Sequence, residues 1–271
     1  MNSKPTLKIG ILGAGAIGQI MAKTLDRWQG RAVVVGLADQ DREHAEKLAA
    51  KLKNAPPVVS VDQLVASADL IVEAASQAAL PDLVPKALEC KKDLLIMSVG
   101  GLLGHDEWFR KAEEQGCRIH IPSGAIAGLD GLRAASMGRL SLVILTSRKP
   151  VAALKGTKYV TDRGIDLDRL KEETVIFEGP PEEACAAFPA TSNVAASLRL
   201  SVGKSVEVRV RVLAVPGGTQ NVHEIQATGD FGRFRIVLEN VPSDNPRTSR
   251  LAALSALATL DSIVRGSQII L

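Results

Sequence analysis

The spacing of three glycines near the N-terminus is the first feature of this sequence that could support chemistry. Gly13, Gly15 and Gly18 form the pattern GxGxxG, with Ala16 and Ile17 directly before the last glycine. The pattern follows an apolar run and opens a stretch with helical periodicity. There, Gly13 makes a tight turn, Gly15 lets the backbone approach a pyrophosphate, and Gly18 allows a helix to pack closely on a strand. The spacing therefore predicts a dinucleotide site with its phosphates at the positive end of a helix.

An acidic residue stands where such a site binds ribose. Asp39 ends the second apolar run, 21 residues after Gly18. A carboxylate there accepts hydrogen bonds from the ribose hydroxyls and repels a 2′-phosphate, which favours NAD. Arg42 lies close enough in the sequence to offset that charge. The expected cofactor is therefore NAD or NADP.

Small residues follow two further apolar runs. Ala75 and Ser76 come after one run, and Ser98 and Val99 end the next. Ligands of open α/β sheets bind outside the carboxyl ends of the strands, so we expect these four residues to line the cofactor site. An ordinary turn at either place is the alternative.

One of the four histidines is placed for proton transfer, a role suited to the near-neutral pKa of imidazole. His44 and His105 fall in polar helical stretches, and His120 lies in an apolar run where we expect a hydrogen-bonded core residue. His223 begins a strand in the segment NVHE and shares a face with Ile225 and Ala227. Both a catalytic and a core role are open to it on this pattern.

Other chemistries find little support. The three cysteines, Cys90, Cys117 and Cys185, are far apart, which argues against a disulfide scaffold or a zinc site and fits a reducing cytoplasm. Cys185 has no adjacent base, which disfavours a thioester mechanism. No clustered carboxylates or HExxH motif indicate a metal, so none is expected. Ser123 precedes a glycine but lacks the GxSxG motif of hydrolases.

Composition excludes several classes of protein. The chain has 271 residues, of which 46% are hydrophobic, enough for a large core and too many for a disordered chain. Basic and acidic residues number 33 and 30, a balance that argues against nucleic-acid binding. No apolar run approaches the roughly 18 residues of a membrane span. We expect a soluble, cytoplasmic protein without nucleic-acid or membrane partners.

The elements that position these residues fall into two groups. Up to Pro122, apolar strands alternate with helices, which indicates βαβ units and a parallel Rossmann-type sheet. After Pro122, longer strands alternate apolar and polar residues, which indicates an α+β domain with a mostly antiparallel sheet. These later strands are expected at 142–147, 206–214, 221–228 and 231–239, the last two forming a hairpin.

A helix expected at 248–264, just after Pro246, should return to the first domain. The predicted dinucleotide-binding domain is therefore 1–123 with 246–271. Residues 124–245 would form the substrate and oligomerisation domain.

Several long segments resemble the L-aspartate dehydrogenase family. They are IPSGAIAGLDG at 121–131, FP at 188–189, NVAA at 193–196, NVHEI at 221–225, GDFG at 229–232, ENVPS at 239–243 and NPRTS at 245–249. Together they cover essentially the whole chain in order.

The resemblance implies an NAD(P)-dependent enzyme that oxidises L-aspartate to iminoaspartate. The imine gives oxaloacetate and ammonia, or feeds quinolinate and so NAD biosynthesis. It also implies that His223 is the active-site residue, that Ala127 and Asn193 contact the nicotinamide cofactor, and that the protein is a homodimer.

A dianionic substrate requires cationic or amide partners. Arg148 and Lys149, just after the strand expected at 142–147, are candidates, with Ser123 and Asn221 as neutral donors. Arg148 and Lys149 could instead simply end a strand in water.

Two other functions compete with this interpretation. One is a related two-domain imine or carbonyl reductase, or a homoserine-type dehydrogenase. The other is a non-catalytic NAD(H)-binding sensor, which needs no titrating histidine.

Overall fold

Two compact units make up the chain. The computed structural model describes residues 5–28, 30–241 and 249–266. Unit 1 comprises residues 1–122 and 253–271, and unit 2 comprises residues 123–252, each with one five-stranded sheet. The second domain boundary expected from the sequence, at residue 246, lies outside the described residues.

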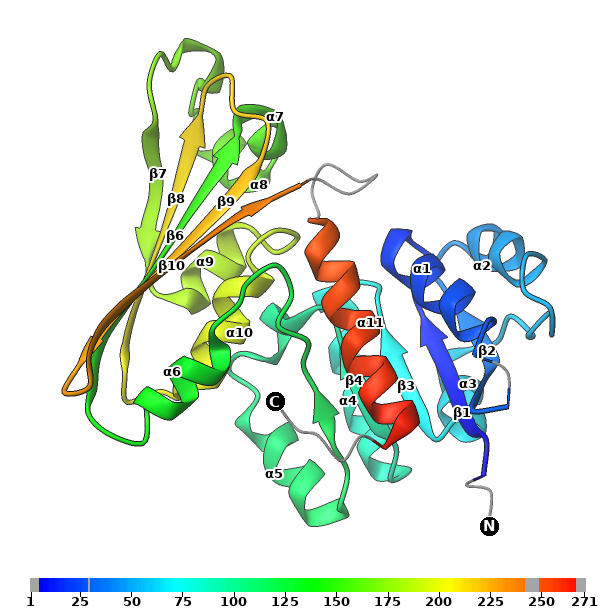
Figure 1. Ribbon diagram of the computed structural model, residues 1–271. Coiled ribbons are helices and arrows are strands. Elements are labelled where there is room, and N and C mark those ends of the chain that lie inside the picture. Colours follow the sequence, from blue (N-terminus) through cyan, green and yellow to red (C-terminus); the bar gives the residue numbers. More distant parts are fainter. Residues whose placement is uncertain (1–4, 29, 242–248, 267–271) are drawn as a thin grey trace. The chain divides into compact units, whose positions relative to one another are not determined.

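Unit 1 contains the parallel sheet predicted from its strand–helix alternation (Figure 1). Its order is β2-β1-β3-β4-β5, so the path of the chain across the sheet reverses between β1 and β3. Every pair of neighbouring strands is parallel. The strands are β1 (Leu7–Leu12), β2 (Ala32–Ala38), β3 (Leu70–Glu73), β4 (Asp93–Ile96) and β5 (Ile119–His120).

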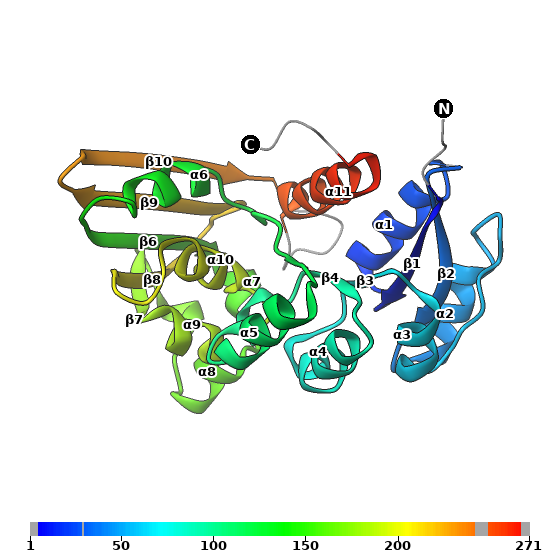
Figure 2. The ribbon, with the colours of Figure 1, turned by 90° about the horizontal axis from the view of Figure 1, so that it is seen from below.

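Helices cover both faces of this sheet (Figure 2). Ala256 and Leu260 of the last helix join a core with strand residues such as Ile9 and Ile11. The helices are α1 (Ala16–Leu25), α2 (Arg42–Ala49), α3 (Val61–Ser67), α4 (Leu80–Glu89), α5 (Asp106–Gln115) and α11 (Arg250–Arg265), with short 3-10 turns η1 (Gln77–Ala79) and η2 (Val99–Leu102). The strand β4 ends at Ile96 and the turn η2 begins at Val99, so the strand is shorter than the apolar run suggested.

Unit 2 contains a mostly antiparallel sheet of order β10-β9-β6-β8-β7. The predicted hairpin joins β9 to β10, with Gly229 opposite Gly232. Two features were not predicted, namely the strand β7 and the parallel pairing of β6 with β8. The strands are β6 (Leu140–Pro150), β7 (Thr174–Gly179), β8 (Glu207–Val215), β9 (Asn221–Gly229) and β10 (Gly232–Asn240).

The two faces of this second sheet differ. On the inner face, alternate residues such as Val143, Leu145 and Ile225 have no exposed surface. Helices gather on that side of the sheet in Figure 2. On the outer face, Arg209 and Arg211 of β8 pair with Glu178 of β7. The helical segments are α6 (Leu129–Ala135), α7 (Val151–Leu154), α8 (Lys158–Asp162), α9 (Pro181–Ala187), α10 (Asn193–Val202) and the turn η3 (Leu167–Arg169).

Candidate active site

The glycine loop of unit 1 has the geometry that a dinucleotide requires. Gly13 has a positive φ of 104°, and a Cβ there would lie 2.5 Å from the carbonyl carbon of Ala74. A Cβ at Gly18 would lie 1.9 Å from the carbonyl oxygen of Gly13. By contrast, nothing lies within 4 Å of a Cβ at Gly15, at the N-terminus of α1. The loop is therefore tight on its protein side and open beside the helix N-terminus, where a pyrophosphate fits.

Asp39, at the end of β2, reaches the same loop. One carboxylate oxygen accepts the backbone N–H of Ala14 at 2.6 Å, and the other accepts that of Asp41 at 2.8 Å. The carboxylate thus lies beside the pyrophosphate loop, where ribose hydroxyls are bound in this fold. Arg42, which could offset its charge, pairs with Glu46 at 2.8 Å on the exposed surface of α2.

Two further loops leave the carboxyl edge of the sheet beside the glycine loop. After β3, Ala75 and Ser76 are exposed, and after β4, Ser98 and Val99 are buried. Both loops are held by Glu73, a buried carboxylate that the sequence analysis did not select. An acidic residue that ends a strand of otherwise buried apolar residues was the available signal, because such a group must be hydrogen-bonded.

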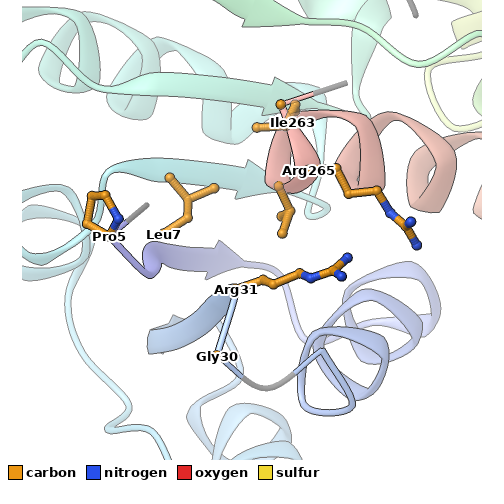
Figure 3. Close-up of a pocket in the computed structure, with 8 residues that line it drawn as sticks. Pro5, Leu7, Gly30, Arg31, Ile263 and Arg265 are labelled. Atoms are coloured by element: carbon orange, nitrogen blue, oxygen red, sulfur yellow. The ribbon is translucent and has the colours of Figure 1, made fainter. Parts of the chain in front are cut away.

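The pocket in Figure 3 lies at the other edge of this sheet. Its volume is about 650 Å³, and its lining includes Leu7 at the start of β1, Arg31 just before β2 and Arg265 at the end of α11. These positions mark the amino ends of the strands. Because doubly wound sheets bind ligands at the carboxyl ends, we do not place the dinucleotide in this pocket.

In unit 2, His223 belongs to a buried polar cluster on the inner face of the sheet. It lies opposite Ser147 in the pairing of β9 with β6, and its Nδ1 is hydrogen-bonded to the Ser147 hydroxyl at 2.9 Å. Only 3% of each residue is exposed. Burial lowers the pKa of His223 to about 3, with a further contribution from the charge of Lys149. His223 is therefore a neutral imidazole at physiological pH.

Lys149 extends the cluster along β6. It lies two residues beyond Ser147, hence on the same face, and is likewise 3% exposed. Its ammonium donates to the backbone carbonyl of Thr191 at 3.3 Å. Burial lowers the pKa of Lys149 to about 8. Among the residues that the structure describes, no carboxylate pairs with this buried cation.

Asn221 completes the cluster. Continuing the β6–β9 register by one residue places it opposite Lys149, and β10 places Asn240 on its other side. Asn240 donates to the carbonyl of Ala125 at 3.1 Å. Within the described ranges, Oδ1 of Asn221 and the hydroxyl of Thr191 are buried without a hydrogen-bond partner. Buried polar atoms are normally paired, so these two indicate a place for a polar ligand.

Arg148 does not belong to this cluster. Since side chains alternate along a strand, it lies on the outer face, next to Lys149 in sequence but on the opposite side of the sheet. Its guanidinium pairs with Glu173 at 2.9 Å and with Glu224 at 3.1 Å. The sequence analysis named both Arg148 and Lys149 as candidates to bind the substrate just after a strand. Because β6 continues to Pro150, the structure places their side chains on opposite faces of the sheet.

Three other expected site residues lie elsewhere in unit 2. Ser123 is half-buried in the segment before α6, and no hydrogen bond links its side chain to the cluster within the described residues. Ala127 is exposed just before α6, and Asn193 begins α10, two residues after Thr191.

The remaining chemically capable side chains are outside both sites. The buried thiol of Cys185 donates to the Ser192 carbonyl, and burial raises its pKa to about 12. His120 corrects our expectation of a hydrogen-bonded core histidine, because its buried Nε2 has no partner in the part of the chain described. Over the same residues there is no group of three or more His, Cys, Asp or Glu suited to a metal, and no helix could span a membrane.

Two family models match this chain. The family of aspartate dehydrogenase C-terminal domains matches residues 130–263, and the NAD-binding domain of homoserine dehydrogenase matches residues 13–122. L-aspartate dehydrogenase of Methanosarcina acetivorans is 44% identical over 268 residues, covering 97% of this chain and 99% of that protein. That of Bradyrhizobium diazoefficiens is 37% identical over 254 residues, covering 94% and 90%.

The fold is also that of a solved structure. Aspartate dehydrogenase from Thermotoga maritima superimposes with a TM-score of 0.66 at 24% identity, covering 98% of this chain and 99% of the other. This is a two-domain NAD(P)-binding protein, and the chain belongs to the L-aspartate dehydrogenase family. The resemblance inferred from the sequence segments is confirmed.

Proposed function

We propose that this protein is an L-aspartate dehydrogenase, which oxidises L-aspartate to iminoaspartate with NAD or NADP and also runs in reverse. The imine hydrolyses to oxaloacetate and ammonia. The observation that carries the proposal is the buried cluster of unit 2. There, Lys149 has no anionic partner among the described residues and lies on the same face of the sheet as the neutral His223. A substrate with two carboxylates and an amino group supplies what that cluster lacks.

Lys149 and Asn221 are the proposed substrate-binding residues of the cluster. The ammonium of Lys149 would bind one substrate carboxylate, since charge-assisted hydrogen bonds to carboxylates are strong in buried sites. Oδ1 of Asn221, an acceptor without a partner among the described residues, would accept from the substrate amino group. Ser123 remains a proposed neutral donor.

His223 is the proposed catalytic residue. Ser147 fixes its ring through Nδ1, and if the hydroxyl accepts that hydrogen bond, Nε2 keeps a free lone pair. In that tautomer His223 takes a proton from the water that attacks the imine carbon. Because burial lowers the pKa of His223 to about 3, imidazolium is costly there, and His223 passes the proton on to the departing ammonia.

The cofactor is assigned to the loops of unit 1. The Gly13–Gly18 loop, with Ala16 and Ile17 in the first turn of α1, would hold the pyrophosphate, and Asp39 the adenosine ribose. Four residues that follow strands at the same edge are also proposed to bind the cofactor, namely Ala75, Ser76, Ser98 and Val99. The family resemblance implies nicotinamide contacts for Ala127 and Asn193, and both stay part of the proposal. A bound nicotinamide would supply the acceptor for the hydride that leaves the substrate α-carbon.

Assembly and cellular role extend the proposal. We propose a homodimer, as the family resemblance implies, with the outer face of the unit 2 sheet as its interface. Light scattering during gel filtration tests it. The free cysteines support a cytoplasmic location, and supply of iminoaspartate to quinolinate, and so NAD, is the proposed role. Coupled quinolinate formation in vitro tests that role.

The experiment that tests the activity follows NADH absorbance with purified protein, NAD and L-aspartate. D-Aspartate, L-glutamate and L-homoserine serve as competing substrates, the last because the NAD-binding unit matches homoserine dehydrogenases. Reduction of NAD with L-aspartate far above the other three is the expected result. Turnover of L-homoserine instead, or tight NADH binding without any turnover, would reject the proposal in favour of a related dehydrogenase or a sensor.

A further inference from the structure

Glu73 is a carboxylate with no exposed surface at the ligand-binding edge of unit 1. It ends β3, which lies beside β1 at the point where the path of the chain across the sheet reverses. Doubly wound sheets bind their ligands at this point. Burial raises the pKa of Glu73 above its usual range, so keeping a carboxylate there is costly. A local cost of this kind is typical of functional positions.

The contacts of Glu73 reach two different loops. Its Oε1 accepts the backbone N–H of Ala75 at 2.8 Å and the hydroxyl of Ser98 at 2.9 Å. Its Oε2 accepts the backbone N–H of Ser98 at 2.9 Å. No lysine, arginine or histidine pairs with it in the described part of the chain. The carboxylate therefore acts as a hydrogen-bond acceptor that fixes the loop after β3 against the loop after β4.

A third loop is held against the first two. The backbone N–H of Ala74 donates to the carbonyl of Leu12 at 2.8 Å, directly before the glycine loop. Gly13 packs so closely on Ala74 and Ala75 that a Cβ would come within 2.7 Å of their backbone atoms. A shift of the Ala75 backbone would therefore displace the glycine loop as well.

The order of the strands indicates which part of a dinucleotide would bind beside these loops. Asp39 directly follows β2, which lies on one side of β1, and the helix N-terminus at Gly15 follows β1 itself. In doubly wound folds the adenosine and the pyrophosphate bind at those positions. The other half of a bound dinucleotide would then extend over the ends of β3 and β4, where Glu73 holds both loops.

We propose that Glu73 is a positioning residue for the nicotinamide half of the cofactor. Its carboxylate holds the backbone of Ala75 and Ser98 in the arrangement that this half of the dinucleotide binds. The inference rests on the proposed cofactor site of unit 1 and not on the identity of the substrate.

Calorimetric titration of Glu73→Gln with NADH and with ADP-ribose, which lacks nicotinamide, tests the proposal. The amide keeps one acceptor oxygen but turns an NH2 group toward an N–H or O–H donor. We expect NADH to bind about tenfold more weakly, as for loss of a hydrogen bond to a charged group, and ADP-ribose to change by less than about twofold. The matched control Asp39→Asn, on the adenosine side, should weaken both ligands.

Equal weakening of both ligands by Glu73→Gln, together with a lower unfolding temperature, would overturn the proposal and make Glu73 a general structural residue. Unchanged binding of both would overturn it too. Should Glu73→Gln not fold, Ser98→Ala decides, since it removes only the hydroxyl contact. It should weaken NADH by about threefold and leave ADP-ribose unchanged, and no effect on NADH would reject the proposal. Because no experiment here uses aspartate, failure of the proposed activity would leave these results intact.

Discussion

The two faces of the unit 2 sheet place chemically similar side chains in opposite situations. Lys149 and His223 lie on the inner face, and their chain neighbours Arg148 and Glu224 lie on the outer face. The outer pair is fully engaged, since Glu224 binds Arg235 through two hydrogen bonds of 2.9 Å and also binds Arg148 at 3.1 Å. Inside, a lysine lacks an anion and two polar atoms lack any partner among the described residues.

This difference separates stability from function. An ion network whose groups all have partners stabilises the fold without a ligand, and only modestly where its cations are exposed. A buried ammonium without an anion destabilises the free protein, and a dianionic ligand removes that cost when it binds. Variants of neighbouring residues on the two faces should therefore divide into those that lower activity and those that lower stability.

The largest expected effect is at His223. His223→Ala should lower kcat/KM for L-aspartate by roughly 100- to 10,000-fold, the usual range for loss of a proton-transfer group. Its neighbour Glu224→Gln, on the outer face, should stay within about threefold because it touches no substrate. Steady-state rates of NADH formation measure both. Equal losses of kcat/KM in the two variants would show that the two faces of the sheet do not differ in function.

Lys149 gives the next largest effect. Lys149→Met should lower kcat/KM by roughly 100-fold, a loss of about 2.7 kcal/mol, since a substrate carboxylate would be buried without its cation. The matched variant Arg148→Met should keep near-normal kcat/KM and lose stability instead. Kinetics and urea unfolding of the pair, side by side, test this. Full activity in Lys149→Met would remove that residue from the site.

The stability of the free protein should depend on pH through Lys149. The pKa of this group is lowered by burial from 10.5 to about 8, so between those values the unfolded chain binds a proton that the folded chain does not. Wild-type stability should therefore rise with pH from about 8 to 10.5 relative to Lys149→Met. Below pH 8 the variant should be the more stable protein by up to about 3 kcal/mol. Parallel unfolding curves across this range would contradict the assignment.

The smallest effect is expected on the outer face. The hydrogen bonds from Arg235 are the main cause that lowers the pKa of Glu224 to about 2, so this carboxylate stabilises the fold above about pH 4.5. Because Arg235 is largely exposed, Glu224→Gln should cost only about 1 kcal/mol at pH 7. That difference should shrink as the pH falls from 4.5 toward 2, where the wild-type group is protonated. Acid and neutral urea titrations compare the two proteins.

Local patterns predicted much of the fold. The glycine spacing, the strand–helix alternation of unit 1 and the β9–β10 hairpin are set by residues close in sequence, and the structure confirms them. The strand β7 was missed because its short segment stands among acidic residues. The β6–β8 pairing was missed because no local pattern fixes which distant strands become neighbours.

The candidate site of unit 2 was harder to predict, because its residues come together only through the pairing of strands that are distant in sequence. Ser147 and His223 are 76 residues apart, so their hydrogen bond follows from strand register and not from any motif. Arg148 and Lys149 were expected together because β6 was expected to end at Ser147. Because β6 continues to Pro150, the side chains of Arg148 and Lys149 lie on opposite faces of the sheet. Glu73 was not selected, although an acidic residue at the end of an apolar strand was a signal. The two loops that it joins come together only in the folded sheet.

The most direct test of the account is a crystal structure of the protein with L-aspartate and ADP-ribose, which cannot accept a hydride. The account predicts L-aspartate on the inner face of the unit 2 sheet. One carboxylate should be within hydrogen-bond distance of Lys149 Nζ, and the amino group should face Oδ1 of Asn221. Aspartate bound elsewhere, with Lys149 and Asn221 still without a ligand, would contradict the claim that these unsatisfied groups form the substrate site.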